Sequence, residues 1–590
     1  MKATRKLMSV ALLLVIVAAV ALAAGGGQQS GGTSGGSTPT LSSLPRRETL
    51  YFNGLLWGAP THFNPFNVDS SFGITPFTPL SRQLIYESLF IFNLLDAKLY
   101  PQLADSYTWN GQNVTVVLNR NVKFNDGTAM TADDVVYTYE LQNRYTTSGT
   151  AYWSYIDSVR KIDNYTVEIR GKSSNFNPKM IETSLCALYI VPKHVWEGIE
   201  KQVSGPTGIV QYPNWEPVAT GPYKPYIYDD TKVVLIRDDN YWGKIASKYG
   251  KLPAPKYVAH NVYKDNASGD AAFRAGEVDV SQQFISQVWT FGSSVETYIP
   301  QAPYYFPGVI PSIVFNTTKP GLDDPAVRRA IAMALDYDMI GKNAMSGYTA
   351  PMVASLMLPV PAEQTLIDAD ALKPYQWNGV DIAGANRLLD QAGWVRGADG
   401  IRAKGGTRLS FRAECPAGWS DWNASLEVVA QVGRQLGMDI TTYFPEANVW
   451  QADKDNATFD IIMHSYGGAG PASPWNRAYE TMSSADIPPV GSPNRVGNFG
   501  RWSNPRANQI IAQLAAESNP ATLKQLWTEL NIIYLQNMPA AGLMYRPVVF
   551  HTVNTSVWTG FPKMGDGTNI PPTICSDGYG INALYRISPK

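Results

Sequence analysis

The sequence contains few residues that bind metals or form disulfides: 3 cysteines and 5 histidines in 590 residues. Three scattered cysteines cannot build a disulfide framework, although one bridge in an oxidising compartment remains open. No histidine lies in an H-E-x-x-H motif or four residues from another histidine or a cysteine, which leaves a zinc site without support. We therefore predict that the protein holds no metal and no cofactor.

Catalytic motifs are absent as well. No G-x-x-x-x-G-K-[ST] sequence occurs, so any nucleotide hydrolysis must belong to another protein. Residues 32–36 match G-x-S-x-G, but they lie in a Gly/Ser tract without the strand and helix that this motif needs. Paired carboxylates such as Asp133 and Asp134 are typical of turns and helix starts. We predict that the protein is not an enzyme. The alternative functions are a secreted glycoside-processing enzyme and a non-transport sensor.

Charge is scarce. Charged residues make up 16% of the chain, against about 25% in typical soluble domains, and the net charge is −1. A nucleic-acid partner is not expected, because phosphate binding needs a basic face. The chain has 16 Trp and 32 Tyr. A surface poor in charge and rich in these side chains suits neutral polar ligands.

The N-terminus has the pattern of an export signal. Lys2, Arg5 and Lys6 precede an apolar segment over residues 7–24, and residues 21–23 fit a small-x-small cleavage site. We predict a signal peptide over residues 1–24 and a periplasmic or cell-surface protein. An uncleaved tether is the alternative, since 18 residues can span a bilayer. Gly25 follows this segment, so there is no lipobox cysteine, and residues 25–44 form a Gly/Ser-rich linker.

Residues 100–140 contain strong local signals. Residues 114–118 (VTVVL) predict a strand, and residues 125–127 (NDG) predict a turn. Thr131 and Asp134 have capping-box spacing before VVYTYELQ, which predicts a helix that starts at residue 132. Residues 50–53 predict an earlier, short strand.

Residues 100–140 also resemble the signature P-x-L-A-x-S-Y … V-x-L-x-x-x-V-K-F-x-D-G-x-x-x-T-A-x-D-V-x-Y of the large solute-binding proteins of ABC importers. This is the oligopeptide/dipeptide/nickel-binding family, bacterial solute-binding family 5. Further blocks resemble the family in sequence order, including a family helix over QLIYESLFIFN; they lie at residues 83–93, 220–223, 240–243, 272–279, 324–330 and 385–394. Arg328 and Arg329 belong to one of these blocks, and we expect them to pair with nearby carboxylates.

The resemblance implies an α/β fold, the two-lobe periplasmic binding protein of type II, cluster C, with a hinge and an extra domain inserted in the first lobe. The chain would cross between lobes near residues 302–311 and 544–547. A monomer that serves an ABC permease with a separate ATPase is implied as well. The implied boundaries are 45–78, 215–307 and 546–590 for the first lobe, 79–214 for the inserted domain and 308–545 for the second lobe.

The ligand is suggested by residues 459–479 (FDIIMHSYGGAGPASPWNRAY), which resemble the family's f-D-i-x-x-x-x-W-x-a-d-y-x-d-P segment. In the peptide binders of the family, an aspartate there neutralises the peptide's amino terminus. Residues 467–474 contain no acid, and a buried, unpaired ammonium costs several kcal/mol. The segment resembles the oligosaccharide-binding branch, whose ligands include cellobiose and other β-linked glucosides. An oligopeptide is the alternative.

Loops after strands face the cleft in α/β lobes, and aromatic faces bind sugar rings while amides and carboxylates bind hydroxyls. These rules select nine candidate ligand contacts. We expect Trp57, Trp422 and Trp475 to stack on sugar rings and Tyr466 to form a cleft wall. The expected hydroxyl partners are Asn53, Asn64, Asp421, Asn423 and Asn476. The alternative for each tryptophan is core packing, and for each asparagine an Asx-turn.

Overall fold

The computed structural model describes residues 44–56, 58–67, 83–147, 149–377, 379–468, 470–490, 492–494, 496–572 and 578–590. The fold below is that of Pro45–Lys590, which forms one compact unit. The expected signal peptide and nearly all of the linker lie outside the described residues. Among the described helices, none combines the length and apolar character needed to cross a membrane.

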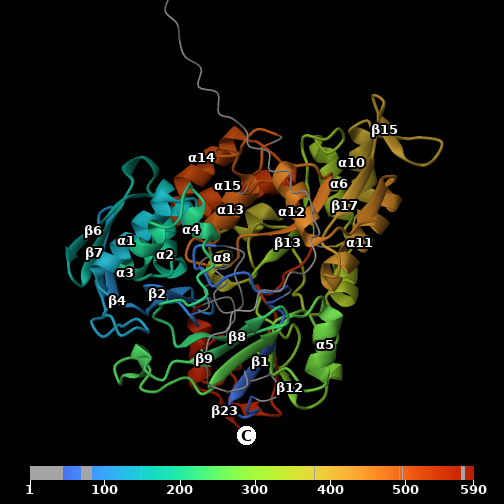
Figure 1. The fold of residues 1–590 in the computed structure, drawn as a ribbon. Coiled ribbons are helices and arrows are strands. Elements are labelled where there is room, and N and C mark those ends of the chain that lie inside the picture. Colours follow the sequence, from blue (N-terminus) through green and yellow to red (C-terminus); the bar gives the residue numbers. More distant parts are fainter. Residues whose placement is uncertain are drawn as a thin grey trace, which may run out of the picture. The chain divides into compact units, whose positions relative to one another are not determined.

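The first lobe is built on a seven-stranded mixed sheet, which contains β1 from the first part of the described chain (Figure 1) and β21 from its last part, with β11 between them. β1 runs parallel to β10 and β11, whereas β21 runs antiparallel to β11. The sequence prediction of a first strand is confirmed by β1. The sheet order is β12 (Val295–Thr297), β21 (Thr552–Asn554), β11 (Val280–Ser281), β1 (Thr49–Asn53), β10 (Tyr257–Asn261), β9 (Lys232–Arg237) and β8 (Tyr223–Asp229).

The inserted domain has an antiparallel four-stranded sheet in the order β4 (Ala104–Asn110), β5 (Asn113–Leu118), β7 (Thr166–Gly171) and β6 (Ile156–Asp163). The predicted strand, turn and helix are confirmed: β5 covers residues 114–118, and α1 begins at residue 132. Asp134 Oδ2 accepts from the Thr131 N–H at 2.8 Å, as a capping box requires. The other elements are β2 (Phe90–Asn93), β3 (Lys98–Pro101), α1 (Ala132–Arg144), α2 (Pro178–Ala187), α3 (Lys193–Glu200) and α4 (Gly208–Gln211).

The helix expected over residues 83–93 is wrong. The segment is extended and ends in β2, because its backbone pairs with the Gly-Pro-Tyr block instead of with itself. Gly221 N–H donates to Ile85 O at 2.9 Å, and Tyr223 N–H donates to Leu84 O at 2.9 Å. These partners lie more than 130 residues away, so no local pattern could reveal them.

The second lobe has a five-stranded sheet in which β17, β18 and β19 are mutually parallel, whereas β13 is antiparallel to β19 and β20. Its order is β18 (Asp439–Tyr443), β17 (Ser410–Glu414), β19 (Ile461–Tyr466), β13 (Ile310–Phe315) and β20 (Ala540–Gly542). The longer helices of this lobe are α6 (Pro325–Ala334), α10 (Ile382–Gln391), α11 (Ser420–Leu436), α12 (Ala447–Asn456), α13 (Trp475–Met482), α14 (Pro505–Leu514) and α15 (Pro520–Asn537).

Short elements complete the chain. The helix α5 (Asn266–Arg274) lies beside β11 in the first lobe. The other short α-helices and β-strands are α7 (Tyr337–Met339), α8 (Pro361–Gln364), α9 (Ala369–Leu372), β14 (Val395–Arg396), β15 (Arg402–Lys404), β16 (Thr407–Arg408), β22 (Trp558–Thr559) and β23 (Ser588–Pro589).

Two backbone segments connect the lobes. The N–H groups of Gly308 and Val309 both donate to Arg546 O at 2.9 Å, and Arg546 N–H returns a bond to Val309 O at 3.0 Å. These residues lie beside β13 and β20, close to the two crossings implied by the sequence. We call this pair of segments the hinge.

The expected carboxylate partners of Arg328 are also wrong. Arg328 is buried at 2% exposure, and its guanidinium donates to backbone carbonyls at distances of 2.6–3.1 Å. The acceptors are the carbonyls of Leu322, Asp323, Asn537 and Met538. Five N–H donors in a fixed fork suit several carbonyls at once, so the arginine joins the start of α6 to the end of α15.

Candidate functional site

The carboxyl ends of the parallel strands in the first lobe form one edge of its sheet. Asn53 ends β1 beside Ser281, which ends β11, and Gln282 and Gln283 follow directly. Because β21 is antiparallel to β11, its first residue Thr552 lies beside Ser281 at the same edge. In open α/β sheets, ligands bind outside the carboxyl ends of strands.

This first-lobe edge contains buried acceptors that have no hydrogen-bond partner among the described residues. They are Asn53 Oδ1, Ser281 Oγ and Gln283 Oε1. Buried polar atoms are normally paired, so such a group of acceptors indicates a place where water or ligand hydroxyls donate.

The same side chains are held firmly by their other ends. Asn53 Nδ2 donates to Gly269 O at 2.8 Å, and Gln283 Nε2 donates to Asn266 O and Asp270 Oδ1, both at 2.6 Å. Burial raises the pKa of Asp270 to about 6. The acceptors are thus fixed against α5 before any ligand arrives.

In the second lobe, the segment after β19 is held from both sides. Arg477 Nε donates to Gly467 O at 3.0 Å, and Gly467 N–H donates to Glu480 Oε2 at 2.7 Å. The next residue packs on the hinge, since a Cβ added at Gly468 would lie 3.1 Å from Gly308 O. α13 therefore positions this segment beside the hinge.

A small cavity of about 30 Å³ lies next to the hinge. Its wall includes Tyr305, Gly308, Val548 and His551, so it connects the hinge to the first-lobe edge. Gln282 Nε2 lies 3.2 Å from His551 Nε2, which continues the polar row towards the cavity. We call this space the hinge cavity.

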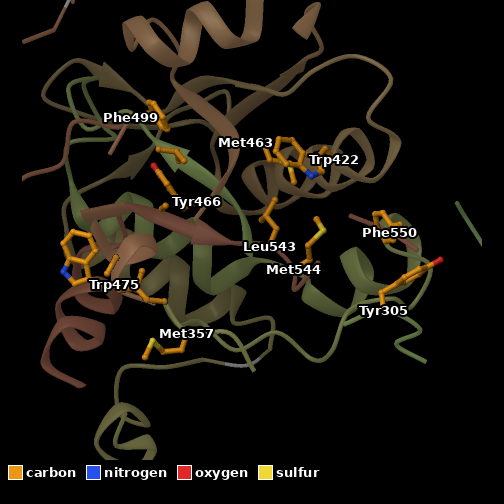
Figure 2. Close-up of a cluster of buried hydrophobic side chains, with 14 of the residues drawn as sticks. Tyr305, Met357, Trp422, Met463, Tyr466, Trp475, Phe499, Leu543, Met544 and Phe550 are labelled. Carbon is orange, nitrogen blue, oxygen red and sulfur yellow. The ribbon is translucent and has the colours of Figure 1, made fainter. Parts of the chain in front are cut away.

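The three aromatic candidates that the structure describes are buried and well packed. Trp422 is 5% exposed and lies 4.9 Å, ring to ring, from Trp419, whereas Trp475 is 7% exposed and donates through Nε1 to Ile511 O at 2.8 Å. Tyr466 stacks on Phe499 at 6.1 Å. Figure 2 shows Trp422 and Trp475 apart, with Tyr466 and Leu543 between them. The structure therefore does not bring the two indoles to one ligand ring.

The polar candidates separate into two groups. Asn53 lies on the first-lobe edge with an acceptor available. The others engage protein partners: Asn64 donates to Ile209 O and Tyr212 O, Asp421 accepts from Arg546 Nε at 2.7 Å, Asn423 donates to Pro416 O, and Asn476 donates to Glu480 Oε1. Trp57 lies outside the described residues. Among the nine candidates, Asn53 thus has the clearest free binding capacity in the described part of the chain.

Three residues that sequence reasoning missed are better placed. Ser281 and Gln283 complete the first-lobe edge, and Trp419 is 38% exposed at the start of α11. Trp419 belongs to the same CPAGWSDWN segment as Trp422. The sequence contained a signal for Trp419: it directly precedes the helix, where a side chain is more easily exposed than that of Trp422 in the first turn.

One carboxylate lies close to the acid-free segment. Glu480 is thirteen residues beyond Gly467, and burial raises its pKa. Its two oxygens already accept from Gly467 N–H and Asn476 Nδ2. The absence of acid within residues 467–474 therefore does not remove negative charge from the neighbourhood, although this carboxylate is directed towards the protein's own donors.

Glu414, at the carboxyl end of β17, gives a pH-dependent prediction. Burial raises its pKa from 4.5 to about 7, although Arg412 Nη2 lies 2.9 Å from its Oε2. The folded protein therefore holds a proton that the unfolded chain releases, so the free energy of unfolding falls as pH rises from about 4.5 to 7. We expect Glu414→Gln to remove about 2–3 kcal/mol of this fall. Urea denaturation of the wild type and of Glu414→Gln at pH 5 and pH 8 measures the fall in the free energy of unfolding. An equal fall in the two proteins would contradict the prediction.

The described residues include no group of three or more His, Cys, Asp or Glu side chains placed to hold a metal ion. The arrangement offers hydrogen-bond acceptors, aromatic walls and a hinge. Such features suit the binding of a ligand.

Comparison with known proteins agrees with this geometry. Residues 98–488 match the family model "Bacterial extracellular solute-binding proteins, family 5 Middle". The chain belongs to this family. It is an extracytoplasmic solute-binding component of an ABC importer. The two-lobe α/β fold expected from the sequence is confirmed.

Three relatives illustrate the range of the family. Protein XP55 of Streptomyces lividans is 27% identical over 386 residues, which cover 64% of each chain. The nickel-binding periplasmic protein of Escherichia coli K12 is 26% identical and covers 67% of this chain and 72% of its own. The mannohexaose-bound periplasmic oligopeptide-binding protein of Thermotoga maritima is 26% identical, with a TM-score of 0.82 over 93% of this chain and 99% of its own.

Proposed function

We propose that this protein captures a neutral oligosaccharide of the β-glucan type, such as cellobiose or a longer relative, between its lobes. It delivers the sugar to an ABC permease that is powered by a separate ATPase. The observation that carries the proposal is the likeness to the Thermotoga protein, which has mannohexaose bound although its name refers to oligopeptides. The uncharged run over residues 467–474 supports a ligand without an ammonium group.

The first-lobe edge supports the same ligand class. Sugar hydroxyls donate hydrogen bonds, and Asn53 Oδ1, Ser281 Oγ and Gln283 Oε1 are acceptors that await donors. A ligand that contacts this edge and the second lobe together favours the closed state, because only that state completes both sets of contacts. Micromolar affinity, about −8 kcal/mol, is within reach of several such bonds and ring contacts.

An oligopeptide is the second candidate, favoured by one observation. Glu480 places a carboxylate against Gly467, and an amino terminus that displaced the Gly467 N–H or the Asn476 amide would find a charge partner there. In that case Glu480→Gln would abolish binding of peptides with a free amino terminus.

Isothermal titration calorimetry separates the two candidates. We expect mannohexaose and cello-oligosaccharides to bind with micromolar dissociation constants, whereas tri- and pentapeptides give no heat. The same peptides with acetylated amino termini are the control for recognition of the ammonium group. Peptide binding that is lost on acetylation, with silent sugars, would overturn the oligosaccharide proposal.

A further inference from the structure

Trp419 is an exposed indole at the place where the two lobes touch. Its side chain is 38% exposed, and the rings of Trp422 and Trp450 support it at centroid distances of 4.9 and 5.8 Å. An exposed ring that is held by two buried rings has a fixed orientation, which lowers the entropy lost when a ligand stacks on it.

Polar groups of the first lobe lie beside the residues on either side of Trp419. Asn266 Nδ2 donates to Ser420 Oγ at 3.3 Å, which joins the start of α5 to the start of α11. A Cβ added at Gly418 would lie 3.9 Å from the Cβ of Asp265. One lobe thus contributes an aromatic face and the other contributes an amide and an exposed carboxylate.

The strand order places the strand before this junction two positions from the hinge strand, while the side chain of Asp421, two residues after Trp419, contacts the hinge residue Arg546 at 2.7 Å. In the second lobe, β17 is separated from the hinge strand β13 by β19, so the loop that carries Trp419 starts two strand spacings, about 10 Å, from it. In the first lobe, α5 follows β10, which lies three strands from β21, the strand that follows the hinge. A chain that reaches from the hinge cavity to Trp419 is therefore longer than one pyranose ring.

We propose that Trp419, with Asn266, Asp265 and Ser420, forms an outer subsite that binds a distal ring of a long oligosaccharide and so selects for chain length. This inference rests on the proposed oligosaccharide function. Stacking on Trp419 supplies the ring contact, while the Asn266 amide and the Asp265 carboxylate bind hydroxyls of the same ring. Because the groups come from both lobes, occupancy of the outer subsite also stabilises closure.

The test compares cellobiose with cellohexaose, and mannobiose with mannohexaose, by calorimetry on the wild type and on Trp419→Ala. We expect the variant to lose about tenfold in affinity for the hexasaccharides and to bind the disaccharides like the wild type. Tyr226→Ala is the matched control, because that ring is equally exposed, at 38%, and lies on β8, the outermost strand of the first-lobe sheet, outside this junction. It should leave all four affinities unchanged.

The outcomes separate the two proposals. A wild type that binds no sugar overturns the oligosaccharide function and the subsite together. Hexasaccharide binding that Trp419→Ala leaves unchanged, or an equal loss for both chain lengths, overturns the subsite alone. Trp419→Phe keeps an aromatic face and should recover most of the hexasaccharide affinity, and a failure to recover would assign the loss to packing on Trp422 and Trp450.

Discussion

The Arg477→Met variant is expected to have a free energy of unfolding about 3–5 kcal/mol lower than that of the wild type, because it leaves the buried Glu363 carboxylate without its charge partner. The two side chains are 3% and 6% exposed and form a bidentate pair at 2.8 and 3.0 Å. Arg477 also donates to Leu356 O and to Gly467 O. The same substitution frees the Gly467 carbonyl, so we expect weaker sugar binding as well. Urea denaturation and titration with mannohexaose measure the two effects.

A double variant separates stability from positioning. Glu363→Met with Arg477→Met replaces the buried pair by apolar side chains, which commonly restores most of the lost stability. It cannot restore the anchor on the Gly467 carbonyl, so binding should stay weak. Arg408→Met is the surface control, since Arg408 pairs with Asp399 at about half exposure and should change stability by less than about 1 kcal/mol. A double variant as unstable as Arg477→Met would contradict the stranded-charge explanation.

Arg328→Met should destabilise the second lobe by about 4 kcal/mol, because it leaves buried carbonyls of Leu322 and Met538 without donors. Burial lowers the pKa of Arg328 to about 10, which keeps it charged at neutral pH. The neighbouring Arg329→Met is the matched control. Arg329 is half-buried and its Nε has no hydrogen-bond partner among the described residues, so its loss should cost little.

Arg328→Lys tests the geometry of this contact. A lysine keeps the charge but has no planar fork, so it cannot reach both ends of the α6–α15 junction. We expect it to be nearly as unstable as Arg328→Met in urea denaturation. Wild-type stability for the lysine variant would show that charge alone suffices and would contradict the role given to the fork.

Local signals predicted local structure well. The capping box at Thr131 and the β-branched run before it predicted α1 and β5, because these elements are stabilised mainly by neighbours within a few residues. The same reasoning failed for residues 83–93, whose backbone partners are at Gly221 and Tyr223. It failed again for Arg328, because an arginine in a sequence does not show whether carboxylates or carbonyls surround it.

In the candidate site too, local features of single side chains were predictable and long-range contacts were not. The sequence singled out Asn53 and the loop of residues 415–423, but it preferred Trp422 to Trp419. Exposure depends on the phase of α11 against Trp450, which lies on another helix. Likewise, the composition of residues 467–474 showed no acid, whereas Glu480 reaches Gly467 only after α13 folds back against β19.

By itself the sequence determined the family, the α/β class, the low charge and the short-range helix and strand starts, since these depend on composition and near neighbours. Only the tertiary structure decided which indole is exposed, which acceptors lack partners and which arginines are buried. Each of those properties depends on contacts between segments far apart in the chain, and such contacts exist only once the lobes are packed.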